Sequence, residues 1–205
     1  MICAMTRILL ARHGETDWNR DGRWQGHNDQ PLNDHGRGQA RALGAHLATL
    51  RVDALYASDL ARARETAAAV EVATGLEATI DAELREVDVG DWVGCNREQA
   101  SERDPEWYRR WADGVVEGYH GGETYEQLQR RSVRAFLRIT DASDGRTAVI
   151  VCHGGNIRAI VSEVVGLSAA ERWRVAGVAN CSLTLIERRN GRLTLVTFNE
   201  TGYLD

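Results

Sequence analysis

The chain has 205 residues, of which 43% are hydrophobic and 27% charged, and its formal net charge is -5. This length and composition are typical of a globular protein, so we expect one domain over residues 1–205. The negative charge argues against binding to nucleic acid or to an anionic membrane surface. None of the 25 basic residues is a lysine, which excludes Schiff-base chemistry and a Walker-type phosphate-binding lysine.

The longest apolar runs are too short to cross a bilayer, and residues 1–7 lack the basic start and long apolar core of a signal peptide. Four cysteines, Cys3, Cys95, Cys152 and Cys181, stand apart without a CxxC pair. Isolated cysteines of this kind are typical of reduced thiols. We therefore expect a cytoplasmic protein.

Residues 6–16, TRILLARHGET, combine a short apolar run with a polar end that contains glycine. The apolar run is too short for an independent helix and predicts a buried strand. Arg12 and His13 then stand at its carboxyl end, where open α/β sheets bind ligands. An imidazole beside a fixed cation suits attack on an anionic electrophile, for which a phosphate is the first candidate.

Residues 17–33 are rich in Gly, Asn and Asp and predict an ordered, functional loop rather than a helix. Asp34 is expected to cap the helix that follows, in which apolar residues recur at helical spacing up to Leu50. A second strand is expected over residues 52–58.

The second expected strand ends at Ser58 and Asp59, both good caps for the next helix. That helix ends at Gly75. Residues 84–94, LREVDVGDWVG, predict a short strand or an extended loop.

One or two short, exposed helices are expected within residues 95–114. Aromatic side chains gather in this part of the chain, which is consistent either with a lid over a pocket or with plain packing: Trp92, Trp107, Tyr108, Trp111 and Tyr119. We interpret residues 88–122 as a variable segment that covers the pocket and sets substrate specificity.

A helix over residues 124–139 precedes another apolar run, residues 148–151, which ends at His153 and two glycines. A helix is expected next, and residues 181–199 predict a hairpin joined by Asn190-Gly191. Alternating strands and helices predict a three-layer α/β/α sandwich, with a mainly parallel sheet and an antiparallel edge strand.

Three strand-to-helix junctions carry complementary chemistry. The first presents Arg12 and His13, the second Arg62 on the first turn of a helix, and the third His153 with glycine amides at a helix N-terminus. Arginine forks and helix N-termini both bind phosphate oxygens. The junctions therefore predict a phosphate pocket without a metal, since the arginines repel a cation.

Four motifs resemble the histidine phosphatase superfamily, also called phosphoglycerate-mutase-like. They are RHGETDWNRDGRWQGHNDQPLNDHGRGQA, YASDLARARETA, LREVDVGDWVG and VCHGGNIRA, and they occur in the order typical of that family. RHG alone is a weak signal, but four motifs in order over most of the chain are specific. The resemblance implies a phosphoglycerate-mutase-like fold.

The resemblance implies that His13 is the nucleophile and forms a phosphohistidine intermediate, with Glu86 as general acid and base. The nearby arginines lower the pKa of His13 and so favour its neutral form. The other implied site residues contact the phosphoryl group or the incoming group: Arg12, Arg62, His153, Asn19, Gln25 and Gly154. Neighbouring residues are weaker candidates for the same roles: Glu83, Asp88 and Asp91 for Glu86, and Arg64 for Arg62.

The motifs do not separate a phosphatase from a mutase. The short chain and the RWQGHNDQPL loop favour a phosphomonoesterase acting on a small phosphorylated metabolite, without cofactor. A cofactor-dependent phosphoglycerate mutase is the first alternative and a non-catalytic binding protein the second, although a degenerate member is expected to lack His13 or Glu86. Arg97, Arg109 and Arg110 are either substrate contacts or solvated charges, and a homodimer is expected only by family analogy.

Overall fold

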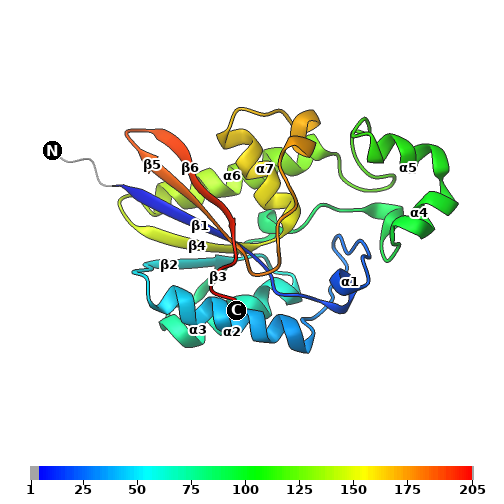
Figure 1. Ribbon diagram of the computed structural model, residues 1–205. Coiled ribbons are helices and arrows are strands. Elements are labelled where there is room, and N and C mark those ends of the chain that lie inside the picture. The colour runs from blue at the N-terminus through cyan, green and yellow to red at the C-terminus, as the bar shows by residue number, and fades with distance from the viewer. Residues whose placement is uncertain (1–4, 205) are drawn as a thin grey trace.

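The computed structural model describes residues 5–204 (Figure 1). Its strands are β1 Thr6–Arg12, β2 Ala54–Ala57, β3 Ala78–Ile80, β4 Thr147–Cys152, β5 Leu183–Arg189 and β6 Arg192–Glu200. In this part of the chain they form one six-stranded sheet in the order β3-β2-β4-β1-β5-β6. The first four in that order are parallel, β5 is antiparallel to β1, and β6 is antiparallel to β5. The predicted mainly parallel sheet with an antiparallel hairpin at its edge is confirmed.

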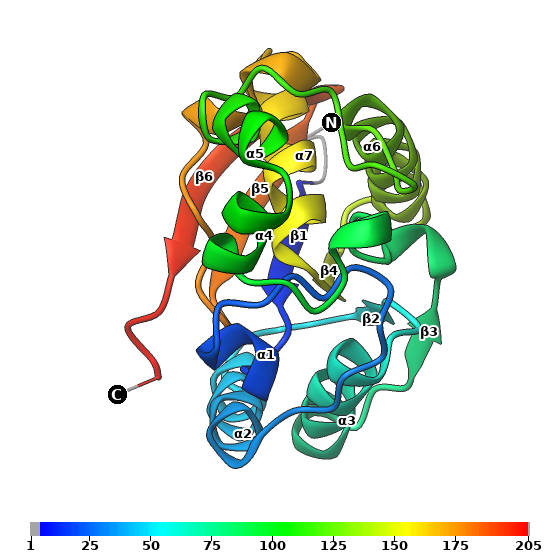
Figure 2. The ribbon, with the colours of Figure 1, turned by 90° about the vertical axis from the view of Figure 1, so that its right-hand side faces the viewer.

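The longer helices cover both faces of this sheet. They are α2 Asp34–Ala48, α3 Ala61–Thr74, α6 Tyr125–Ala142 and α7 Gly154–Val164. Helices α2 and α3 lie on one face and α6 and α7 on the other, as Figures 1 and 2 show. The three-layer α/β/α architecture predicted from the sequence is therefore confirmed.

Strand β1 is central and buried on both faces, which explains its continuous apolar run. Ile8 and Leu10 pack with the α6 and α7 side, while Leu9 and Ala11 pack with the α2 and α3 side. Because side chains alternate along a strand, both sets must be apolar. Its backbone pairs with β4 and β5, and this fixes the position of the residues that follow Arg12.

The turn between β5 and β6 has the conformation predicted from Asn190-Gly191. Both residues have positive φ, 51° and 75°, as a two-residue hairpin turn of type I′ requires. This agreement shows that the edge of the sheet follows from local turn chemistry.

Two predicted helix caps are wrong. Asn33, not Asp34, caps α2, and its side chain accepts a hydrogen bond from the amide of Gly36. Leu60, rather than Ser58 or Asp59, is the cap residue of α3, and it provides no side-chain hydrogen bond. Instead the carboxylate of Asp29, from the first loop, accepts the Ala61 amide at 2.5 Å. A partner remote in sequence supplies this cap, so local sequence rules cannot find it.

Short elements account for the remaining differences from prediction. The expected loop over 17–33 contains one helical turn, α1 Asp17–Arg20, closed by a capping box between Thr16 and Asn19. The region expected as a strand or loop over 84–94 contains the short 3₁₀ helix Gly90–Trp92, and another 3₁₀ helix, Ala82–Leu84, ends at its first residue.

Residues 88–122 contain two short helices, α4 Arg97–Arg103 and α5 Pro105–Ala112. They lie at the end of the molecule toward which β1 and β4 run (Figure 1). Helix α5 is not simply exposed, because it buries Trp107 and Trp111. These indoles pack with Trp92 and with Trp24 of the first loop, the Trp92 and Trp107 rings stacking with centroids 4.2 Å apart. Aromatic packing therefore attaches this segment to the first loop.

The three cysteines that the structure describes, Cys95, Cys152 and Cys181, are free thiols; Cys3 lies outside the described residues. None of the described helices is both long enough and apolar enough to cross a membrane.

Candidate active site

A cavity of about 340 Å³ opens at the carboxyl end of β1. Seven of the eight predicted site residues line it: Arg12, His13, Asn19, Gln25, Arg62, Glu86 and Gly154. The eighth, His153, is fully buried, and its ring centroid lies 5.1 Å from that of His13. The structure thus brings the four sequence motifs together at one place.

His13 is 2% exposed and has a defined tautomer. Its Nδ1 lies 2.7 Å from the carbonyl oxygen of Gly14. A carbonyl only accepts, so Nδ1 carries the proton and the lone pair is on Nε2. The pKa of His13 is well below its usual value because of burial first and the charges of Arg62 and Arg12 second. The arginine effect predicted from the sequence is present, but burial is the larger cause.

The lowered pKa predicts how activity depends on pH. If neutral His13 is the reactive form, kcat/KM stays high as pH falls through about 6.5, the ordinary histidine value, and drops only at the lower pKa of the folded chain. Arg62→Gln removes a repulsive charge, so the His13 pKa should rise and the acid limb should move to higher pH. Proton NMR titration of His13 measures this directly.

The matched control for this titration is Arg64→Gln, since Arg64 is exposed on the same helix. We expect no shift of the His13 pKa in that variant. An Arg62→Gln chain whose His13 titrates as in the unaltered chain would contradict the electrostatic explanation.

Arg12 and Arg62 extend from different elements into the cavity. Arg62 is fully buried and donates to the carbonyl oxygens of Asn28 and Gly26 at 2.9 and 2.8 Å, and burial lowers its pKa to about 10. Arg12 donates to the carbonyl of Val178. In the described structure the Nε atoms of both remain buried without a hydrogen-bond partner, so both guanidinium groups retain capacity to bind an anion.

His153 contacts Ser58 rather than the cavity surface. Its Nε2 lies 2.9 Å from the Ser58 hydroxyl, and burial and then Arg62 hold its pKa well below the usual value. Ser58 was expected to cap the following helix, and that expectation is wrong. Ser58 has the position along the chain that is typical of a helix cap. Its side chain instead contacts His153 at the end of β4, and sequence spacing alone does not reveal this contact.

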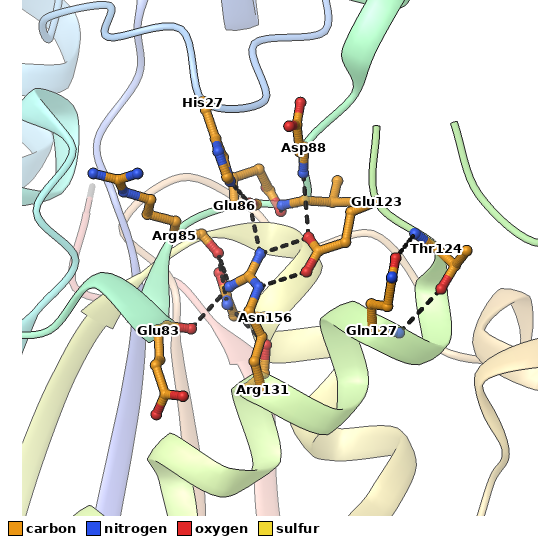
Figure 3. Close-up of polar contacts among 12 residues, drawn as sticks. His27, Glu83, Arg85, Glu86, Asp88, Glu123, Thr124, Gln127, Arg131 and Asn156 are labelled. Atoms are coloured by element: carbon orange, nitrogen blue, oxygen red, sulfur yellow. Dashed lines mark hydrogen bonds and ion pairs between the residues drawn. The ribbon is translucent and has the colours of Figure 1, made fainter. Parts of the chain in front are cut away.

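Glu86 has its carboxylate at the start of α7. Its Oε1 accepts from the amides of Val87 and Gly155 at 2.8 and 3.1 Å. Its backbone carbonyl accepts from His27 Nε2 and from Arg131 Nη2. Figure 3 shows Arg131 projecting from α6 into the segment that carries Glu86.

Arg131 holds this segment through several bonds at once. Its guanidinium also donates to the carbonyls of Glu83 and Arg85 and forms an ion pair with Glu123 at 2.7 Å (Figure 3). Only 16% of the Arg131 side chain is exposed. A planar fork with five donors suits three carbonyls and a carboxylate, so Arg131 fixes the loop around Glu86. This role is not visible in the sequence, because nothing in α6 distinguishes Arg131 from its arginine neighbours.

Gly155 must be a glycine for Glu86 to keep its position. A Cβ at Gly155 would lie 2.1 Å from Glu86 Oε1, whereas a Cβ at Gly154 would meet its nearest atom, Arg12 Nε, at 3.7 Å. We expect Gly155→Ala to displace the carboxylate and lower kcat by about 100-fold, the scale of a lost acid–base catalyst. Gly154→Ala should cost far less, and steady-state rates of both folded variants test this. Equal losses would contradict the geometric argument.

Asn19 and Gln25 come from the first loop. Asn19 Oδ1 accepts from Thr16 and from Asn180, and Asn180 also donates to the His13 carbonyl at 2.9 Å. Gln25 is 6% exposed. Asn180 was not predicted as a site residue, because the segment between α7 and β5 carries no recognisable motif.

The three arginines for which the sequence leaves open a substrate contact or a solvated charge separate in the structure. Arg97 lines the cavity, whereas Arg109 and Arg110 are exposed and are not among the residues that line it. Among the described residues, no group of three or more His, Cys, Asp or Glu side chains is placed to hold a metal ion.

The sequence model of the histidine phosphatase superfamily (branch 1) matches residues 8–201. The chain therefore belongs to this superfamily, and its fold and neighbours make it an enzyme of the phosphatase class. Among solved structures, mycobacterial glucosyl-3-phosphoglycerate phosphatase superposes with a TM-score of 0.88 at 30% identity, covering 96% of this chain and 100% of that one.

Two further relatives extend the comparison. YhfR of Bacillus stearothermophilus superposes with a TM-score of 0.90 at 29% identity, covering 98% of this chain and 100% of that one. A Citrobacter koseri protein named "Probable phosphoglycerate mutase GpmB" is 34% identical over 184 residues, which are 89% of this chain and 85% of that protein. The relatives thus include proteins named as phosphatases and as a mutase.

Proposed function

We propose that the chain hydrolyses a small phosphomonoester through a phosphohistidine intermediate on His13. The main support is the state of His13, a buried neutral imidazole whose lone pair is on Nε2 and which lines one cavity with Arg12, Arg62 and Glu86. A free lone pair, fixed positive charge and a carboxylate are the parts that phosphoryl transfer needs.

In the first step His13 Nε2 attacks phosphorus and the bond from phosphorus to the ester oxygen breaks. Glu86 gives its proton to the leaving alcohol. Arg12, Arg62 and the Gly154 amide, with Asn19 and Gln25, stabilise the phosphoryl oxygens or position the group that attacks next. His153 does not line the cavity, and we assign it to the same phosphoryl group from its place beside the His13 ring. In the second step water attacks phosphorus, Glu86 takes a proton from it, and the N–P bond breaks to release phosphate and His13.

The proposed reaction needs no metal, because the arginines supply the positive charge that a metal ion supplies elsewhere. Residues 88–122 set specificity, since Trp111, Tyr119 and Arg97 of this segment line the cavity. The names of relatives suggest phosphoglycerate derivatives as substrates.

The test is phosphate release in EDTA from p-nitrophenyl phosphate, phosphoglycerates, sugar phosphates and nucleotides. We expect turnover that EDTA does not reduce and that a His13→Ala variant lacks. Turnover that requires added metal would overturn the metal-independent mechanism.

A phosphoglycerate mutase is the second candidate, favoured by the likeness to the protein named GpmB. The two reactions share the first step and differ in whether water or a second phosphoglycerate oxygen accepts the phosphoryl group. Interconversion of 2- and 3-phosphoglycerate after priming with bisphosphoglycerate, with little phosphate released, would establish the mutase. No reaction in either assay would leave the non-catalytic binding protein.

A further inference from the structure

The cavity has a second wall that the proposed reaction does not use. It consists of Arg158 on α7, Arg172 in the 3₁₀ helix Ala169–Arg174, and the rings of Tyr125 and Trp173, and we call it the distal wall. All four side chains line the same cavity as His13.

Arg172 is a buried cation whose bonds in the described structure go to backbone carbonyls. It is 7% exposed, and its Nη atoms donate to the carbonyl oxygens of Ala169 and Val116 at 3.2 and 3.1 Å. Its guanidinium carbon lies 3.3 Å from the centre of the Tyr125 ring. Its Nε is buried and has no hydrogen-bond partner among the described residues. A buried charge without a counter-ion is costly unless a ligand supplies one.

Arg158 extends this positive wall toward the phosphate-binding residues. It follows Gly154 by four residues on α7, a distance of about 6 Å along the helix axis. Its Nη2 donates to the Arg172 carbonyl at 2.7 Å, and its guanidinium carbon lies 5.3 Å from the Trp173 ring centre. Its Nε, like that of Arg172, is buried without a partner in the part of the chain that the structure describes.

The charge of the whole cavity exceeds what one phosphate can neutralise. Among the described residues, the cavity is lined by one carboxylate, Glu86, and by six arginines, Arg12, Arg23, Arg62, Arg97, Arg158 and Arg172. A phosphomonoester carries about -1.5 to -2 near neutral pH. Positive charge therefore remains at the distal wall after the phosphate is bound beside His13.

We propose that the distal wall is a second anion subsite, and that the substrate carries a second anionic group a short chain away from its ester phosphate. A carboxylate or a second phosphate has the oxygen pairs that an arginine fork binds. The proposal rests on the proposed function for the phosphate end, and it narrows the substrate class to phosphomonoesters with two acidic groups.

Binding to a His13→Ala chain tests the proposal without requiring turnover. 3-Phosphoglycerate and glycerol 3-phosphate differ only in a carboxylate against a hydroxymethyl group, and calorimetry measures the Kd of each. A second pair, fructose 1,6-bisphosphate and fructose 6-phosphate, tests for a second phosphate in the same way. In at least one pair, we expect the ligand with two acidic groups to bind at least about tenfold more tightly than its partner. The pair that shows the preference identifies the second anion. Equal affinities within both pairs would overturn the proposal.

Variants of the His13→Ala chain then test whether the distal wall causes the preference for the ligand with two acidic groups. Arg158→Gln should reduce the ratio of the two Kd values to below about threefold, and Arg158→Lys, which keeps charge but loses the fork, should reduce it partly. Arg110→Gln removes an exposed charge outside the cavity and should leave the ratio unchanged. A ratio that persists in both folded Arg158 variants would overturn the proposal.

The two proposals can fail separately. A chain that never releases phosphate but shows the preference would retain the subsite and lose the phosphatase mechanism. A chain that hydrolyses p-nitrophenyl phosphate but shows no preference within either ligand pair would retain the phosphatase mechanism and lose the subsite.

Discussion

Replacing His13 with alanine is expected to lower kcat by at least about 10⁴-fold, the scale seen when a covalent nucleophile is removed. The alanine chain lacks the Nε2 lone pair that forms the N–P bond, and no lysine exists in the sequence to replace it. Arg12 and Arg62 remain, so phosphate binding should persist while turnover stops. Steady-state phosphate release and calorimetric titration with inorganic phosphate measure the two properties.

The covalent intermediate gives a second readout. Substrate labelled in its phosphoryl group, followed by an alkaline quench, should label the unaltered chain on His13 and leave His13→Ala unlabelled. His35→Ala is the matched control, because His35 is exposed on α2 and should label and turn over normally. Label on the His13→Ala chain would refute His13 as the nucleophile.

The sequence predicted the parts of the site that lie at strand ends. Arg12, His13 and Gly154 occupy places where an apolar strand stops, and that pattern is local and readable. The hairpin at Asn190-Gly191 and both helical layers follow from equally local signals. These elements therefore agree with the structure to within a few residues at their ends.

Residues whose roles depend on contacts with distant parts of the chain could not be predicted from such local patterns. Ser58 looks like a helix cap but pairs with His153, and Arg131 looks like a surface charge on α6 but holds the Glu86 segment. The same holds for Arg172, which reaches the cavity from a segment without a motif. Each depends on a partner far along the chain, so its role emerges only from tertiary packing.

Replacing Glu86 with glutamine is expected to lower turnover of an alkyl phosphate by about 10²–10⁴-fold, the usual contribution of a general acid–base group. Glutamine keeps the oxygen that accepts the Val87 and Gly155 amides, so the fold and the position of the side chain should persist. It cannot transfer a proton, so both the leaving alcohol and the attacking water lose their partner. Steady-state rates with glycerol 3-phosphate measure the loss.

The two roles of Glu86 separate when the leaving group changes. p-Nitrophenolate leaves without a proton, so the first step should remain fast in Glu86→Gln while water attack slows. Rapid mixing should then show a burst of p-nitrophenolate that approaches the enzyme concentration, followed by slow turnover. Asp91→Asn, at an exposed carboxylate in the same motif, should behave as the unaltered chain. A pure proton donor does not affect a leaving group that departs without a proton. If Glu86→Gln slows both the burst and the later turnover of p-nitrophenyl phosphate as strongly as it slows hydrolysis of glycerol 3-phosphate, Glu86 therefore serves instead to hold the phosphoryl group.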